Sequence, residues 1–189
     1  VNTAKAMAEG ARKAGLLETI PEITTDTTLV EPGCYVEDLN QVGPTFLKMG
    51  AFKFLNQHLQ QPFEGMLSPA EGRAKLARYL SEREPAPGHL NVHVTHDTIL
   101  AVLVAELHGH RRITEDDWPW MMEGLWVRFE ANHMHWVWRG RHGRRELDSN
   151  TSGSLPSPRA GFNPDAAPPP HNLCFRKSVS VHSFLHPAR

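Results

Sequence analysis

Thr95, His96 and Asp97 are the adjacent residues of this chain best suited to chemistry. An imidazole beside a carboxyl group can bind an anion and move a proton, and transfer of a phosphoryl group needs both a positively charged donor and a proton source. The same residues also fit a structural role, because Thr95 or Asp97 can cap a helix and His96 can be a partly buried histidine with satisfied hydrogen bonds. The elements on either side decide where these side chains lie.

The three polar residues stand where a predicted strand meets a predicted helix. Apolar and polar residues alternate over residues 90–95, which is typical of a β-strand. Residues 99–107 are apolar over most of a helix circumference, which indicates a buried helix, and Gly109 is a suitable end for it. Ligands bind at the carboxyl ends of strands in α/β folds, and helix N-termini attract anions such as phosphate. This arrangement predicts an anion site at residues 95–97.

The segment that spans this turn and helix reads THDTILAVLVAEL. It resembles the second-histidine motif of the histidine phosphatase superfamily, which includes acid phosphatases, phytases and phosphoglycerate mutases. Residues 118–141, WPWMMEGLWVRFEANHMHWVWRGR, resemble the strand pair that ends the catalytic domain of that family. Residues 3–16, TAKAMAEGARKAGL, resemble the helix that follows its first catalytic segment. The resemblance covers residues 1–141 and implies an α/β fold, a three-layer phosphoglycerate mutase-like sheet with flanking helices.

The resemblance also implies a mechanism. Members of the family transfer a phosphoryl group to a histidine of an RHG segment, while arginines and a second histidine hold the phosphate oxygens. By this resemblance His96 binds the phosphate beside Thr95, and Asp97 donates the proton to the leaving alcohol. In one branch of the family a loop acid is the donor instead. Glu31, with its neighbours Glu37 and Asp38, is a candidate by position only, and such loop acids are more often solvated.

The chain departs from the family pattern at its start, because no RHG segment precedes Thr3. We therefore expect the domain to be N-terminally incomplete. The leading prediction is phosphomonoester hydrolysis by the intact fold, an activity that this chain need not retain. One alternative is a pseudoenzyme that binds phosphate or a protein. A further alternative is a circularly permuted phosphatase that uses the RHG at residues 141–143. In it His142 is the nucleophile, and the substrate-binding arginines are Arg141, Arg145 and Arg189.

Two histidine pairs have spacings that occur in metal sites. They are His93 with His96, and His133 with His135. Strand positions three apart point to opposite faces, and the second pair flanks a turn without a nearby thiolate or carboxylate. We therefore predict no metal site and no cofactor.

Composition narrows the class of protein. The chain has 189 residues, of which 40% are hydrophobic and 22% charged, as in a globular domain with a sizeable core. A net charge of −1 gives no reason to expect a nucleic acid partner. No apolar run approaches the roughly 20 residues of a membrane span, and no signal peptide is visible. The predicted partner is a phosphorylated small molecule, and the compartment and oligomeric state stay open.

The remaining pattern predicts two parts. Residues 1–147 form the α/β domain, with helices over residues 2–16, 44–61, from Ser68 onward and, capped by Thr114, over residues 115–122. Strands over residues 125–129 and 134–138 form a hairpin whose arginine-rich end, residues 139–145, is solvated. Residues 148–189 are rich in proline and serine, which predicts a disordered tail.

Overall fold

The protein is a mixed α/β structure, as the sequence predicts. The computed structural model describes residues 2–30, 33–83, 85–86, 89–147 and, as backbone, 178–183. The helices in chain order are α1 (Asn2–Lys13), α2 (Leu39–Met49), α3 (Ala51–His58), α4 (Pro69–Ser81) and α5 (Asp97–His108). The strands are β1 (Leu90–Thr95), β2 (Gly124–Glu130), β3 (His133–Trp138), β4 (Arg141–Glu146) and β5 (Ser178–Ser183).

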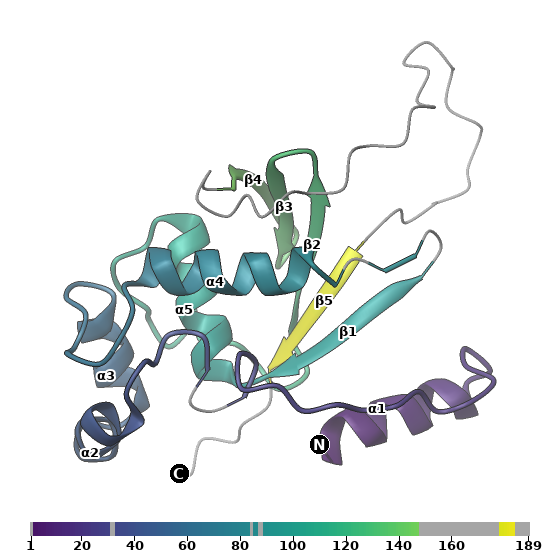
Figure 1. Cartoon of the computed structure of the whole chain (residues 1–189), viewed down its shortest axis with the longest axis horizontal. Helices are drawn as coiled ribbons and strands as arrows, with labels where there is room; N and C mark the ends of the chain where they lie inside the picture. Colours follow the sequence, from purple (N-terminus) through teal and green to yellow (C-terminus); the bar gives the residue numbers. More distant parts are fainter. Residues whose placement is uncertain (1, 31–32, 84, 87–88, 148–177, 184–189) are drawn as a thin grey trace.

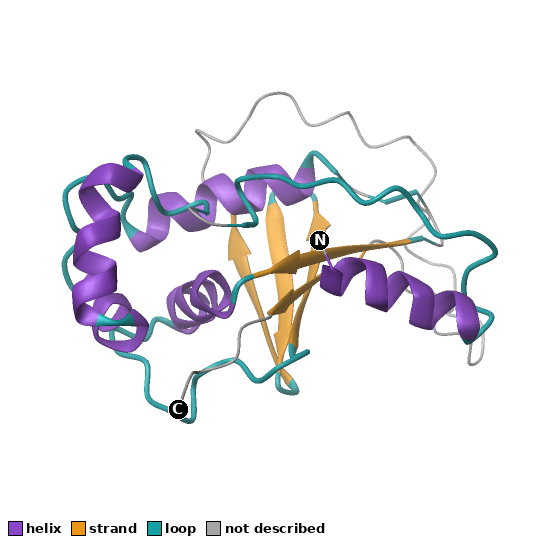
Figure 2. Cartoon of the chain, turned by 90° about the horizontal axis from the view of Figure 1, so that it is seen from below, coloured by secondary structure: helices purple, strands orange, loops and turns teal. Residues whose placement is uncertain are grey.

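The strands form one sheet in the order β1-β5-β2-β3-β4 (Figure 1). β1 and β5 run parallel, whereas β5, β2, β3 and β4 are antiparallel to their successive neighbours. α2, α3, α4 and α5 gather on one side of the molecule, and α1 lies apart from them beyond β1 (Figures 1 and 2). The β1–α5 turn therefore lies at the end of an outer strand, beside the last residues of β5.

Strand β5 corrects the prediction of a wholly disordered tail. Residues 178–183 belong to the segment predicted to be disordered, yet they pair with β1 on one side and with β2 on the other. The reason lies in their alternation, Ser-Val-Ser-Val-His-Ser, which fits a strand once two partner strands are available. Those partners are distant in the sequence, so the local pattern gave no sign of them. The rest of the predicted tail lies outside the described residues.

The predicted helix over residues 44–61 is two helices in the structure. Asp38 caps α2, its carboxylate accepting a hydrogen bond from the Asn40 amide at 2.9 Å, so the helix begins before Gly43 and includes Pro44. Gly50, with a φ of 74°, separates α2 from α3. Only glycine adopts that conformation without strain, which explains where the break falls.

Two other local predictions have opposite outcomes. The predicted start of α4 is confirmed, because Ser68 and Glu71 form a reciprocal capping box with Pro69 at the first helical position. The predicted helix over residues 115–122 is wrong. There the Asp117 carboxylate accepts hydrogen bonds from the amide and hydroxyl of Thr114, which stabilises a turn instead. Asp117, one of the acidic residues that suggested a first helical turn, closes this turn instead.

The core forms between the sheet and the buried helix α5. Most side chains of α5 are buried, as its apolar circumference predicts. On β2 the side chains of Leu125, Val127 and Phe129 are buried on one face, while Trp126 on the other face is 41% exposed. The predicted strands over residues 125–129 and 134–138 are confirmed. The arginine-rich segment over residues 139–145 is mostly exposed, as predicted, but it forms a separate edge strand, β4, after a turn at Arg139 and Gly140.

Candidate functional site

The candidate site is the turn between β1 and α5. His96 has an extended backbone, with φ −84° and ψ 150°, and its carbonyl accepts the first hydrogen bond of α5 from the Leu100 amide at 3.1 Å. His96 is thus the N-cap residue of the helix, although its side chain makes no capping hydrogen bond. This geometry leaves the imidazole available for a ligand at the positive end of a helix dipole.

Asp97 is the most unusual group of the site. Its side chain is only 5% exposed, and its two oxygens accept hydrogen bonds from the Thr98 amide at 2.8 Å and from the Trp118 indole nitrogen at 3.0 Å. Both donors are uncharged. Burial raises the pKa of the Asp97 carboxyl above its ordinary value of 3.8, and the hydrogen bond from Trp118 limits that rise. A carboxyl group in this setting retains its proton to a higher pH than a solvated aspartate does.

His96 stands beside this carboxyl group and is partly buried. Its Nδ1 atom is shielded from solvent and has no hydrogen-bond partner among the described residues. A shielded imidazole nitrogen without a partner is costly unless a ligand or water satisfies it. His96 and Asp97 together therefore offer a donor or acceptor and a proton-retaining acid on consecutive residues.

Thr95 has a different role from the predicted one. Its side chain is 3% exposed, and its hydroxyl donates a hydrogen bond of 2.6 Å to the carbonyl of Leu29. The hydroxyl has a single proton, so in this structure Thr95 does not donate to a phosphate oxygen. Instead, this hydrogen bond links the loop that contains Leu29 to the C-terminal end of β1.

The arginines predicted to bind substrate lie away from the turn. Arg145 donates to the carboxylate of Glu106 at 3.0 Å and to its carbonyl at 3.1 Å. Glu106 follows Asp97 by nine residues on α5, which places it about 14 Å further along the helix axis. Arg141 lines a separate cavity of about 250 Å³ whose α5 residues are Ala101, Val104, Ala105 and His108. Neither arginine joins His96 and Asp97.

The sheet also separates His142 from the turn. His142 lies on β4, the outer strand at the edge of the sheet opposite β1. Four strand spacings of about 4.8 Å place these two strands about 19 Å apart. A phosphate held by His96 is therefore out of reach of His142, which contradicts the circularly permuted arrangement with His142 as the nucleophile.

Sequence reasoning missed two residues near the turn. Trp118, which holds Asp97, stands 21 residues further along the chain and carries no local signal of that contact. His182 of β5 is in register with Val94, one residue before Thr95. Its alternating segment was the available signal. The strand pairing thus brings a second histidine position to the edge of the sheet where His96 lies.

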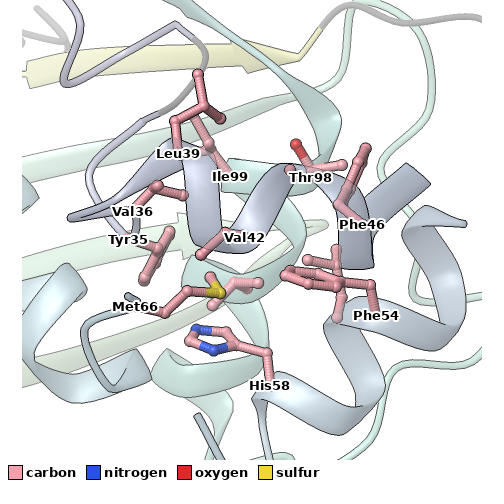
Figure 3. Close-up of a pocket in the computed structure, with 13 residues that line it drawn as sticks. Tyr35, Val36, Leu39, Val42, Phe46, Phe54, His58, Met66, Thr98 and Ile99 are labelled. Carbon is pink, nitrogen blue, oxygen red and sulfur yellow. The ribbon is translucent and has the colours of Figure 1, made fainter. Parts of the chain in front are cut away.

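An apolar cavity of about 110 Å³ lies beside the turn (Figure 3). Thr98 and Ile99 from the first turn of α5 line it, together with residues of α2 and α3. Its walls carry no lysine or arginine, so it is unsuited to a phosphate group.

The remaining predicted site residues do not join the turn within the described part of the chain. Glu31 and Arg189 lie outside the described residues, and Asp38 caps α2. Within the described ranges, no three histidine, cysteine, aspartate or glutamate side chains are grouped so that they could hold a metal ion. In the same part of the chain, no helix has the length and apolar character needed to cross a membrane.

Comparison of the chain with protein-family models, with curated proteins and with solved structures finds no match.

Proposed function

We propose that the β1–α5 turn is the phosphate-binding and proton-donating part of a histidine phosphatase-type site, on a three-layer phosphoglycerate mutase-like fold. The reaction is hydrolysis of a phosphomonoester through a phosphohistidine. The observation that carries the proposal is the buried Asp97 carboxyl, whose pKa is raised, directly beside the N-cap residue His96. A proton donor must hold its proton at the working pH, and burial, the largest influence on the pKa of Asp97, promotes that.

In the proposed reaction His96 and the first amides of α5 stabilise the negative phosphate oxygens. A histidine nitrogen attacks phosphorus, a new N–P bond forms, and the ester P–O bond breaks. Asp97 gives its proton to the departing alcohol oxygen. Water then attacks the phosphohistidine, returns a proton to Asp97 and releases inorganic phosphate, so the enzyme is regenerated.

The nucleophile must approach from the same edge of the sheet as His96. Parallel strands end at one edge, and the parallel pairing of β5 with β1 places His182 in register with Val94. His182 therefore replaces His142 as the histidine to test.

One observation favours a second candidate, a domain that binds phosphate without turnover. Arg145 is occupied by Glu106, and Arg139 is bound to Glu123 at 2.6 Å, so neither is available to neutralise a phosphoryl group at the turn. Phosphoryl transfer normally needs such cations. Binding and turnover must therefore be measured separately.

The test is hydrolysis of para-nitrophenyl phosphate at mildly acidic pH, with three single variants beside the unaltered chain. We expect His96→Ala and His182→Ala to lower the rate at least about 100-fold, since each removes a histidine at the edge of the sheet where the proposed phosphate site lies. The matched control, His142→Ala, changes an exposed histidine at the far edge of the sheet and should retain the full rate.

Inorganic phosphate separates the two candidate functions. A site that binds phosphate raises the melting temperature as the phosphate concentration rises, and His96→Ala abolishes that protection. Protection without hydrolysis supports the binding domain. Neither protection nor hydrolysis, or equal protection in His96→Ala, contradicts a phosphate site at this turn.

A further inference from the structure

The cavity beside α5 has a polar group at its inner end. Leu39 on its rim is 55% exposed, whereas His58 within it is fully buried, so the cavity runs inward from the surface. The walls between them are mainly apolar side chains, including Val42, Phe54 and Met66. Figure 3 shows the imidazole of His58 extending from α3 toward Tyr35 and Met66, among the lining residues. The His58 imidazole is therefore a polar group at the buried end of a mainly apolar cavity.

Neither ring nitrogen of His58 has a hydrogen-bond partner among the described residues. Tyr35 contacts it only through the ring, with centroids 5.9 Å apart and planes at 73°. Burial lowers the pKa of His58 from 6.5 to about 4, so at neutral pH the ring is uncharged, with one nitrogen that donates and one that accepts. A histidine buried with both nitrogens unsatisfied is destabilising, and native proteins rarely leave such groups without a hydrogen-bond partner.

The chemistry of the cavity defines a ligand class. Its volume of about 110 Å³ is comparable to an engineered apolar cavity of about 150 Å³ that binds benzene in another protein. The apolar walls favour a ring or branched hydrocarbon, and the uncharged imidazole favours one hydroxyl group. A charged ligand is disfavoured, because the lining supplies no compensating charge.

We propose that this cavity is a binding site for a small neutral aromatic alcohol of the size of phenol, whose hydroxyl hydrogen-bonds to His58. The rim at Leu39 gives the ligand access, and the lining includes the aromatic side chains of Phe46 and Phe54, which suit an aromatic ring. This site does not depend on the phosphatase proposal, since neither His96 nor Asp97 lines the cavity.

The test uses phenol and toluene, which have the same number of heavy atoms and differ in the hydroxyl group. The ligands are titrated into the full chain labelled with ¹⁵N, and the imidazole nitrogens of His58 are followed by NMR at pH 7. We expect phenol to shift a His58 nitrogen resonance and to bind about tenfold more tightly than toluene, because toluene leaves His58 unsatisfied. This measurement requires no variant to fold.

A variant then tests the role of the imidazole. His58→Leu should bind toluene at least as well as the unaltered chain and should lose the preference for phenol. The matched control His110→Leu changes an exposed histidine outside the cavity and should keep that preference.

Three results would overturn the proposal. The first is that phenol shifts no His58 nitrogen resonance, which means that water alone satisfies the ring. The second is equal affinity for phenol and toluene in the unaltered chain. The third is a preference for phenol that survives in His58→Leu. Because phosphate hydrolysis is not measured, failure here leaves the phosphate proposal untouched.

Discussion

The two ends of α5 each carry a largely buried carboxyl group, and their surroundings differ in kind. Glu106 near the C-terminal end is 2.7 Å from Arg73, which is 4% exposed, and 3.0 Å from Arg145. Asp97 at the N-terminal end accepts hydrogen bonds from the Thr98 amide and the Trp118 indole. One helix thus holds a carboxylate between two cations and a second carboxyl group among uncharged donors.

This difference suggests that Glu106 stabilises the fold, whereas Asp97 is suited to proton transfer. Two guanidinium groups pair with Glu106, and these ion pairs join α4 and β4 to α5. No guanidinium group pairs with Asp97 among the described residues, and burial raises its pKa although the neighbouring His96 opposes that rise. A carboxylate that is fixed in its charged form stabilises the fold, whereas one whose proton is retained can take part in proton transfer.

The largest effect on the free energy of unfolding is expected for a change at Glu106, near the C-terminal end of α5. Glu106→Gln removes the negative charge beside the buried Arg73 guanidinium, and breaking a buried pair in this way costs about 3–5 kcal/mol of unfolding free energy. Urea denaturation at pH 7 measures this loss. The control is Glu130→Gln, which breaks an exposed pair with Arg128 and should cost at most about 1 kcal/mol. Equal losses in both variants would remove the distinction between Glu106 and a surface carboxylate.

The next effect concerns His58, which faces the first turns of α5 across the cavity. Its folded pKa of about 4 lies below the ordinary 6.5, so the unfolded chain binds a proton there at a pH where the folded chain does not. The contribution of uncharged His58 to the free energy of unfolding is therefore fully present above pH 6.5, and it is lost as the pH falls toward 4. The full shift corresponds to roughly 3 kcal/mol.

Urea denaturation at pH 7 and pH 4.5 checks this dependence. His58→Leu should reduce the loss of stability between the two pH values, and His110→Leu should leave the loss unchanged. A slope that is the same in His58→Leu and in the unaltered chain would show that His58 does not titrate as a buried group.

A smaller effect is expected from Trp118. Trp118→Phe keeps an aromatic ring near Phe52 but removes the indole donor at 3.0 Å from Asp97. The loss should destabilise the fold by about 1–3 kcal/mol when Asp97 is ionised. It should also raise the pKa of Asp97 further, because this hydrogen bond favours the charged form. A carbon-detected NMR titration of the carboxyl group gives the direction, and a lowered pKa would contradict this role of Trp118.

The sequence predicts the turn and the helix well because both depend on local patterns. Alternation up to Thr95 and the apolar circumference of α5 are visible within about twenty residues, and Ser68 with Glu71 marks the start of α4. These features follow from hydrogen bonding and burial within one segment.

The failures arise where contacts distant in the sequence decide the structure. β5 becomes a strand only because β1 and β2 lie on either side of it. Thr95 is bound by the Leu29 carbonyl, 66 residues away, and Asp97 is held by Trp118. Such partners leave no local pattern, so sequence reasoning assigned Thr95 to phosphate and gave Trp118 no role.

The measurement that tests the account most directly is a pH titration of the Asp97 carboxyl carbon by NMR, with and without inorganic phosphate. The account predicts a pKa above 3.8 in the unbound chain, because the group is buried among uncharged donors. It also predicts a further rise when phosphate binds beside His96, since a second negative charge disfavours ionisation. A pKa at or below 3.8 that phosphate does not change would contradict the assignment of this turn as a phosphate site with Asp97 as its proton donor.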